Sequence, residues 1–195
     1  MTVPIGWRDG RWLNEPTTWF EDGGDLLVSA DEGSDFWRTT SYGFVHDSGH
    51  ALLTGLPIGS AVEVAFTLDY DEMYDQAGLL VRADESHWVK AGVEISDGHP
   101  QLGAVVTNGC SDWSMAPVPD WAGRRVTLRG SRAGDALTLR ARVDDEPWRM
   151  FRVVPLDPDL AAAAGPYCCA PQHAGLQVRF HTFTTGPADR ALHDA

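Results

Sequence analysis

The chain has 195 residues, of which 43% are hydrophobic, and its formal net charge is −13 at pH 7. This length and composition fit one globular domain with a sizeable apolar core, and they exclude an intrinsically disordered chain. The acidic balance opposes binding to the phosphates of nucleic acids and to anionic membrane surfaces, so we expect neither as a partner.

The cysteines and the N-terminal sequence indicate a compartment. Cys110, Cys168 and Cys169 are an odd number with one adjacent pair, which is a poor disulfide framework and lacks the spacing of a structural zinc site. The first residues, MTVPIGWRDGRWLNEP, lack the basic start and apolar run of a signal peptide, and no run of 18 apolar residues follows. We therefore expect a cytoplasmic protein without cofactor.

Short stretches that alternate apolar and polar residues run through the whole chain and predict β-strands. They are residues 25–30, 61–70, 77–84, 87–96, 101–108, 124–131, 136–143, 148–154 and 175–183. The breaks between them hold turn sequences such as EDGG, SDGHP, RAGD and DDEP. Many short strands at close spacing predict an all-β, two-sheet antiparallel jelly-roll sandwich, in a single domain over 1–195 with its core at about 7–187.

Two other stretches depart from the strand pattern. LDPDLAAAAG (156–165) has the helix propensity of an alanine run and a glycine stop, so it predicts one short helix at an end of the sandwich. DYDEMYD (69–75) gathers carboxylates that suit calcium, but no calcium-loop spacing follows. We interpret it as a charged turn and expect no metal site.

The strands 77–83 and 87–94 carry charged and aromatic groups on the face that a plain core strand would leave to solvent. Val89, Ala91 and Val93 point to one side, and alternate residues point to the other. If the two strands pair antiparallel, that second face carries Gln76, Arg82, Trp88, Lys90 and Glu94, with Gly78 and Gly92 leaving a hollow. This mixture is typical of a site for a sugar or polar metabolite. The alternative is a structural charge network, in which each charge pairs across to a neighbouring strand.

Residues elsewhere are candidates for the rim of such a site. Asp35 and Trp37 fall on one side of an extended segment, where Trp37 is either a stacking platform or an aromatic packed on the sandwich edge. His50 is either a titrating base or a structural histidine. Trp113 lies in SDWS (111–114), which we interpret as a rim loop.

Several longer motifs carry a family resemblance. They are WLNEP (12–16), SDFWRTTSYGFVHDSGHALL (34–53), YDQAGLLVRADESHWVKAGVE (74–94), VVTNGCSDWS (105–114) and GPYCCAPQHAGLQVRFHTF (165–183). The chain resembles the bacterial and fungal concanavalin A-like family of unknown function that carries a "regulation of enolase" label. One departure is Cys169-Ala170-Pro171, where the family pattern has a serine before the proline. The resemblance implies a jelly roll with a curved concave face, a fold shared by lectins, glycosidases and sugar-binding modules.

Three functions follow from these observations. The first is a non-catalytic jelly roll that binds a carbohydrate or polar metabolite on its concave face, using the nine candidate residues above. The second is a protein-interaction module that regulates a metabolic enzyme. The third is a glycoside hydrolase, which needs two carboxyl groups at a defined separation. Glu94 is followed by Ile95, Ser96 and Asp97, which does not match the ExDxxE motif of sandwich glycosidases, so we assign no catalytic residue and expect no enzyme.

Overall fold

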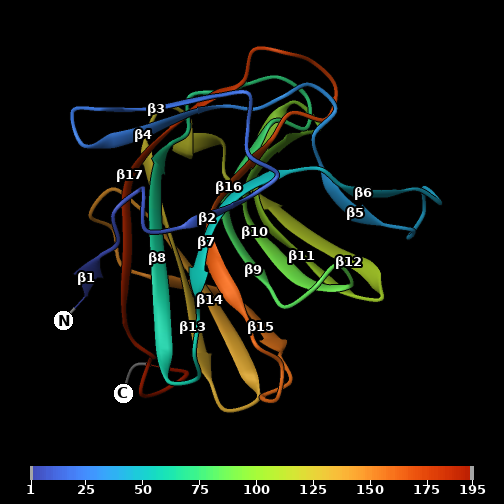
Figure 1. Ribbon diagram of the computed structural model, residues 1–195. Helices are drawn as coiled ribbons and strands as arrows, with labels where there is room; N and C mark the ends of the chain where they lie inside the picture. The colour runs from blue at the N-terminus through green and yellow to red at the C-terminus, as the bar shows by residue number, and fades with distance from the viewer. Residues whose placement is uncertain (1, 194–195) are drawn as a thin grey trace.

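The computed structural model describes residues 2–193, and two large antiparallel sheets face each other across its core (Figure 1). The back sheet has the order β15-β14-β13-β8-β17-β4-β3, and β1 pairs beside β17. Its strands are β1 (Val3–Pro4), β3 (Thr18–Asp22), β4 (Asp25–Ser29), β8 (Ser60–Thr67), β13 (Arg125–Ala133), β14 (Ala136–Val143), β15 (Arg149–Pro155) and β17 (Gln177–Pro187). The all-β sandwich predicted from the sequence is confirmed.

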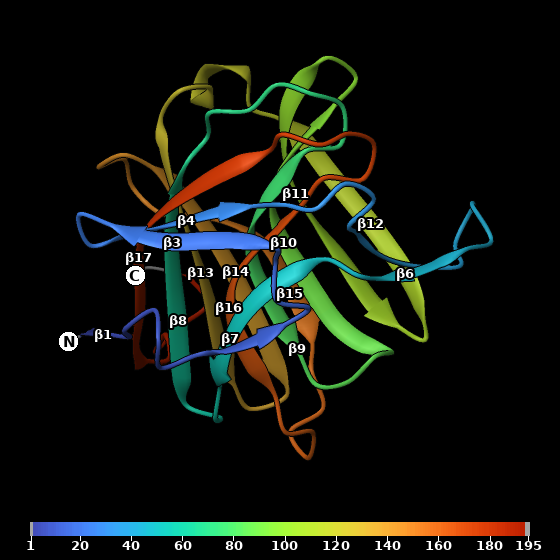
Figure 2. The same cartoon turned by 45° about the horizontal axis from the view of Figure 1, so that its top comes forward.

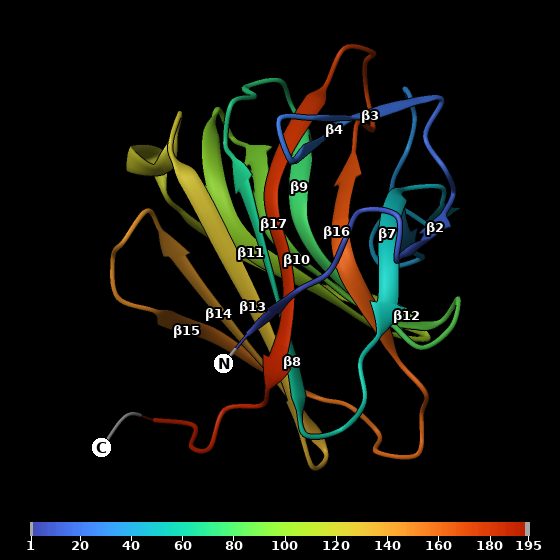
Figure 3. The same cartoon turned by 60° about the vertical axis from the view of Figure 1, so that its left-hand side comes forward.

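The front sheet has the order β12-β11-β10-β9-β16-β7-β2. Its strands are β2 (Arg11–Leu13), β7 (His50–Gly55), β9 (Gln76–Arg82), β10 (His87–Ser96), β11 (His99–Asn108), β12 (Cys110–Pro117) and β16 (Ala163–Cys169). Figure 3 brings β8 and β17 of the back sheet forward, with β9, β10 and β16 of the front sheet behind them. That residues 1–195 form a single domain stays a prediction.

The main core lies between the two sheets and is made by alternate residues of their strands. Val89, Ala91 and Val93 of β10 are buried there, as the period of the sequence predicts, and Val64 and Phe66 of β8 belong to the same cluster. Removing these side chains from water is the main stabilising contribution to such a sandwich. The outer face of the front sheet, on the side away from the back sheet, does not belong to this core.

The predicted helix over 156–165 is wrong. The chain turns after Pro155 and enters β16, which lies between β9 and β7 in the middle of the front sheet. Alanine and glycine serve here as small residues: a side chain on Gly165 would collide with the backbone carbonyl of Leu52. Tertiary packing therefore overrides the helix propensity of the alanine run. Within residues 2–193 the one helical segment is a 3-10 turn, η1 (Pro119–Trp121).

The predicted rim loop at 111–114 is also wrong, because these residues belong to β12. This strand pairs with β11 in a register that sets Trp113 opposite Val105. β12 is the edge of the front sheet and is mostly exposed, so its sequence lacks the strong alternation of a half-buried strand. Every stretch predicted as a strand does contain one.

A separate hairpin, β5 (Phe36–Arg38) and β6 (Val45–Asp47), projects from the sandwich; we call residues 36–47 the arm (Figures 1 and 2). Its base covers part of the outer face of the front sheet and forms a second apolar cluster there. That cluster comprises Phe36, Trp37, Ala51, Leu80, Trp88, Val105, Tyr167 and Cys169. The part of the chain that the structure describes contains no apolar helix of membrane-spanning length.

Candidate functional site

The pairing of β9 with β10 brings the predicted polar face together. Gln76 lies directly opposite Glu94, and Lys90 opposite Leu80, in an antiparallel register. Because directly opposite residues point to the same side of a sheet, Gln76, Lys90 and Glu94 share the outer face of the front sheet. The arm lies over the same face, so these groups become the floor of a pocket rather than a solvated surface.

The pocket has a volume of about 380 Å³. Six of the nine predicted residues line it: Asp35, Trp37, Gln76, Lys90, Glu94 and Trp113. The remaining lining residues are Gly33, Tyr42, Phe44, His46, Tyr74, Val105, Pro171 and Gln172. The pocket therefore combines residues of the arm, of four strands of the front sheet or the segments beside them, and of the loop that follows β16.

Lys90 and Asp35 form an ion pair at the floor of the pocket. Nζ of Lys90 donates a hydrogen bond of 2.9 Å to Oδ1 of Asp35, and the lysine side chain is only 4% exposed. Burial lowers the pKa of Lys90, but the negative charge of Asp35 and the hydrogen bond to it raise the pKa above the ordinary value. Lys90 is therefore a buried ammonium whose charge is balanced by the start of the arm.

Glu94 lines the same pocket as Asp35, but it is not held by a hydrogen bond from Lys90. Burial raises the pKa of Glu94 to about 7, with Lys90 opposing the shift and Asp35 adding to it. Across residues 2–193 no group donates a hydrogen bond to its carboxyl. Glu94 thus exchanges a proton near neutral pH while facing the pocket.

Gln76 offers an acceptor without a partner. Its side chain is 1% exposed, and Nε2 donates to the carbonyl oxygen of Tyr74 at 3.2 Å. Oε1 has no hydrogen-bond partner among the described residues. Tyr74 itself has a φ of 65°, a strained conformation for a residue with a side chain, and such strain is concentrated at functional sites. A buried amide oxygen of this kind costs free energy unless something binds to it.

The aromatic wall of the pocket is built from two elements. Trp37 of the arm and Trp113 of β12 meet edge to face, with ring centroids 6.1 Å apart and an interplanar angle of 84°. The ring of Tyr42 lies edge to face against Trp37, with ring centroids 5.5 Å apart, and stacks on Phe44, with ring centroids 5.3 Å apart. The indole Nε1 of Trp37 donates to the carbonyl of Thr40 at 3.0 Å, which fixes the ring in place.

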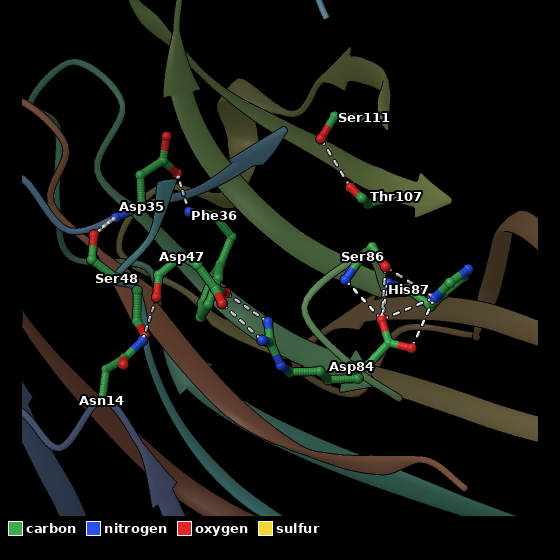
Figure 4. A network of polar contacts seen from close by, with 12 residues as sticks. Asn14, Asp35, Phe36, Asp47, Ser48, Asp84, Ser86, His87, Thr107 and Ser111 are labelled. Carbon is green, nitrogen blue, oxygen red and sulfur yellow. Dashed lines mark hydrogen bonds and ion pairs between the residues drawn. The ribbon is translucent and has the colours of Figure 1, made fainter. Parts of the chain in front are cut away.

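Polar contacts hold the arm against the front sheet (Figure 4). Arg82 makes a bidentate ion pair with Asp47, with N–O distances of 2.6 and 2.8 Å, and Asn14 donates to the carbonyl of Asp47 at 2.8 Å. On the other side, the backbone amide of Arg38 donates to Oγ of Ser111 at 2.9 Å. Arg82 therefore anchors the arm and does not line the pocket.

Two further predicted residues lie outside the pocket. Trp88 is buried beneath Phe36, with ring centroids 5.9 Å apart, and supports the base of the arm. His50 is buried: Nε2 accepts from the backbone amide of Asp31 at 3.1 Å, and Nδ1 lies 2.6 Å from the carbonyl of Asn14. Both ring nitrogens are satisfied by backbone, which is the structural alternative for this histidine.

The predicted hollow at Gly78 and Gly92 is closed by protein. These glycines lie opposite each other in the sheet, and a side chain on Gly92 would collide with the carbonyl of Ala77 and lie 2.9 Å from Oη of Tyr167. The glycines thus allow backbones and a tyrosine to approach closely. The pocket lies beside them, between the floor and the arm.

Asp75, the last residue of the acidic run 69–75, lies close to His173 in the loop that follows β16. Asp75 is buried, and its Oδ1 lies 3.3 Å from Nε2 of His173. Burial raises the pKa of Asp75 to about 6, which His173 opposes. Within residues 2–193 no three His, Cys, Asp or Glu side chains gather as metal ligands would. The pair joins two segments that line the pocket, through Tyr74 and Gln76 on one side and Pro171 and Gln172 on the other.

Sequence reasoning missed the residues of the arm tip and of the loop after β16. Tyr42, Phe44 and His46 belong to SYGFVH within the motif 34–53, where three aromatic rings recur at every second residue. That aromatic content was a usable signal. The contribution of Pro171 and Gln172 had no comparable local signal.

Comparison with known proteins places the chain in a family. A family described as a protein of unknown function (DUF1349) matches residues 12–188. The chain belongs to this family. A relative from Saccharomyces cerevisiae named Regulation of enolase protein 1 is 43% identical over 188 residues, which cover 95% of this chain and 93% of the relative. This confirms the resemblance seen in the motifs.

Solved structures show the same fold. The crystal structure of a functionally unknown protein from Saccharomyces cerevisiae superposes with a TM-score of 0.88 at 38% identity, covering 94% of this chain and 98% of the other. A GH43 protein, BlXynB from Bacillus licheniformis, superposes with a TM-score of 0.71 at 11% identity, covering 94% of this chain but 39% of the other. A xylan beta-1,4-xylosidase from Bacillus halodurans gives 0.66 at 16% identity, with 83% and 32% covered. At such low identity these two glycosidases share only the sandwich fold with the chain.

Proposed function

We propose that the pocket under the arm binds a carbohydrate or a similarly polar metabolite and performs no chemistry on it. The observation that carries this proposal is the combination of an aromatic wall, Trp37 and Trp113, with a buried polar floor, Gln76, Lys90 and Glu94. Aromatic rings cover the apolar face of a ring sugar, and the floor bonds its hydroxyl groups. The pocket volume, about 380 Å³, lies within the usual range of small-molecule sites. The cytoplasmic location inferred above stays a prediction.

The unpartnered Oε1 of Gln76 supports a bound ligand over a purely structural charge network. Gln76 lines the pocket, and a network that existed only to hold the sheet together would satisfy its buried acceptor. The Lys90–Asp35 pair is compatible with both roles, because it fixes the arm and leaves the ammonium at the pocket floor.

The test is a binding screen of the purified protein against monosaccharides and oligosaccharides, read first by thermal shift and then by calorimetry. A ligand at about 100 times its dissociation constant adds roughly 2.7 kcal/mol of stability, which is a shift of several degrees for a domain of this size. We expect Trp113→Ala to abolish the shift. Trp148→Ala is the matched control, because Trp148 is also partly buried and lies just before β15 of the back sheet, where Arg142 stacks over its ring. Equal loss in both variants would contradict the proposed site.

A second candidate function, a protein-interaction module, is favoured by the tip of the arm. Tyr42, Phe44 and Val45 are 56%, 42% and 51% exposed, so apolar groups extend into solvent at one place. The name of the yeast relative points to enolase as the metabolic enzyme to try first. Val45→Glu separates the two functions, because Val45 does not line the pocket. A complex with purified enolase that is lost in this variant, with sugar binding retained, would support the second function.

The glycoside hydrolase alternative has one observation in its favour, which is that the carboxyls of Asp35 and Glu94 line the same pocket. Against it, Asp35 is held by Lys90 and by the backbone amide of Phe36, at 2.9 and 2.7 Å. We expect no turnover of chromogenic glycosides. Turnover that disappears in Glu94→Gln would replace the binding proposal with a catalytic one.

A further inference from the structure

We infer that the pocket selects hydroxyl-rich rings without anionic groups and rejects phosphorylated or carboxylated ones. This inference rests on the proposed function, because it specifies the chemical class of the ligand for the same pocket. The hydrogen-bonding groups and charges that line the pocket support it.

The positive charge at the floor is already neutralised. Lys90 is the one lysine or arginine that lines the pocket, and its ammonium pairs with Asp35 at 2.9 Å. A phosphate or carboxylate would have to compete with Asp35 for that ammonium and would bring a second negative charge next to it. His46 is the other basic group of the lining, and it lies on the arm rather than on the floor.

The floor offers more free acceptors than free donors. Oδ1 of Asp35 is used by Lys90 and by the amide of Phe36, whereas Oδ2 has no partner among residues 2–193. Oε1 of Gln76 is likewise unpartnered, and its Nε2 is used by the carbonyl of Tyr74. The carboxyl of Glu94 lies on the same face without a hydrogen-bond donor from the described part of the chain. A ligand that satisfies these oxygens must supply hydrogen atoms.

Hydroxyl groups meet this requirement and ionised groups do not. A hydroxyl donates its hydrogen to Asp35, Gln76 or Glu94 while its oxygen accepts from the ammonium hydrogens that Lys90 does not use for Asp35. A phosphate or carboxylate oxygen that replaces such a hydroxyl only accepts, so it leaves the protein acceptor unsatisfied. It also repels Asp35 and, when Glu94 is ionised, Glu94 as well. The net charge of −13 adds an unfavourable field for an approaching anion.

The experiment measures dissociation constants by calorimetry for matched sets of ligands. Each set contains one neutral sugar, its uronic acid and its phosphate; the glucose and galactose sets and neutral xylose form the panel. We expect the neutral member to bind and the uronate and phosphate to bind at least about tenfold more weakly. Glu94→Gln removes an ionisable acceptor, so at pH 8 it should reduce the discrimination against the uronate, which stays ionised from pH 6 to 8.

The outcomes separate this inference from the function on which it rests. Equal or tighter binding of a uronate or a phosphate would overturn the inference and leave the pocket as a binding site. Absence of binding by every member would overturn both. A constant ratio between neutral sugar and uronate in wild type and Glu94→Gln at pH 8 would show that the floor does not set the charge preference.

Discussion

Burial on the floor of the pocket raises the pKa of Glu94, and this shift makes the free energy of unfolding depend on pH. The folded protein holds this proton up to a pKa of about 7, whereas the ordinary value is 4.5. The folded state therefore binds more protons than the unfolded state between these values. The contribution of Glu94 to the free energy of unfolding is fully present below pH 4.5 and is lost as the pH rises through about 7.

Glu94→Gln should accordingly stabilise the protein at pH 8, by about 1–3 kcal/mol, and should have little effect at pH 4. The free energy of unfolding from urea titrations at the two pH values measures this difference. Glu85→Gln is the control, because Glu85 is an exposed residue of the turn between β9 and β10. A stability gain that is the same at both pH values would contradict a raised pKa.

Among the structural elements, the arm is anchored by the ion pair between Arg82 and Asp47, beside its other polar contacts. Arg82 is only 12% exposed and is bound by both carboxylate oxygens of Asp47. Removing the carboxylate of Asp47 leaves the largely buried guanidinium of Arg82 without compensation.

We expect Asp47→Asn to loosen the arm, increasing hydrogen exchange of the amides in residues 36–47 while the strands of the sandwich stay protected. Hydrogen exchange read by mass spectrometry gives both signals in one measurement. Asp22→Asn is the control, because Asp22 pairs with Arg179 on the exposed surface of the back sheet. Loss of protection throughout the sandwich would show that the arm is part of the folding core.

The pair of glycines in the centre of the front sheet sets how closely its strands and Tyr167 approach. Gly92→Ala places a methyl group against the backbone carbonyl of Ala77, so we expect a loss of about 1–3 kcal/mol, seen as a lower melting temperature. Gly55→Ala is the matched control, because a side chain there meets no atom within 4 Å and its φ is not in the left-handed region. Equal melting temperatures for the two variants would contradict the close approach.

For the whole molecule, several titrating groups favour a mildly acidic optimum of stability. Burial raises the pKa of Asp75 to about 6, so its contribution, like that of Glu94, is lost as the pH rises. In the opposite direction, hydrogen bonds lower the pKa of Asp84 to about 2, so its contribution is lost only as the pH falls below the ordinary value of 3.8 towards 2. Protonation also reduces the self-repulsion of a chain with a net charge of −13.

We therefore expect the melting temperature to rise as the pH is lowered from 8 to about 6 and to fall again below about 4. Differential scanning calorimetry between pH 3 and 9 at constant ionic strength measures this profile. The double variant Asp75→Asn, Glu94→Gln should have a flatter profile between pH 6 and 8. A melting temperature that increases steadily up to pH 8 would contradict the assignment.

How much the sequence predicted depends on whether a feature is local. The period of two in residues 87–96 placed Val89 in the core and Lys90 on the opposite face, and both assignments hold because alternation is a property of the strand itself. The alanine run at 161–164 led to a wrong helix prediction, because local propensity carries no information about the neighbours of β16. His50 and Trp88 are residue types that suit a ligand site, but the sequence does not show which groups surround them in the fold.

By itself, the sequence determined the sandwich class, the core face of its main strands, the family and the outward direction of Gln76, Lys90 and Glu94. Only the tertiary structure decided that the arm covers this face, that Asp35 pairs with Lys90, 55 positions away in the chain, and that Arg82 pairs with Asp47. The physical reason is that side-chain direction follows from local backbone geometry, whereas an ion pair between distant residues follows from how the strands order themselves and close their loops.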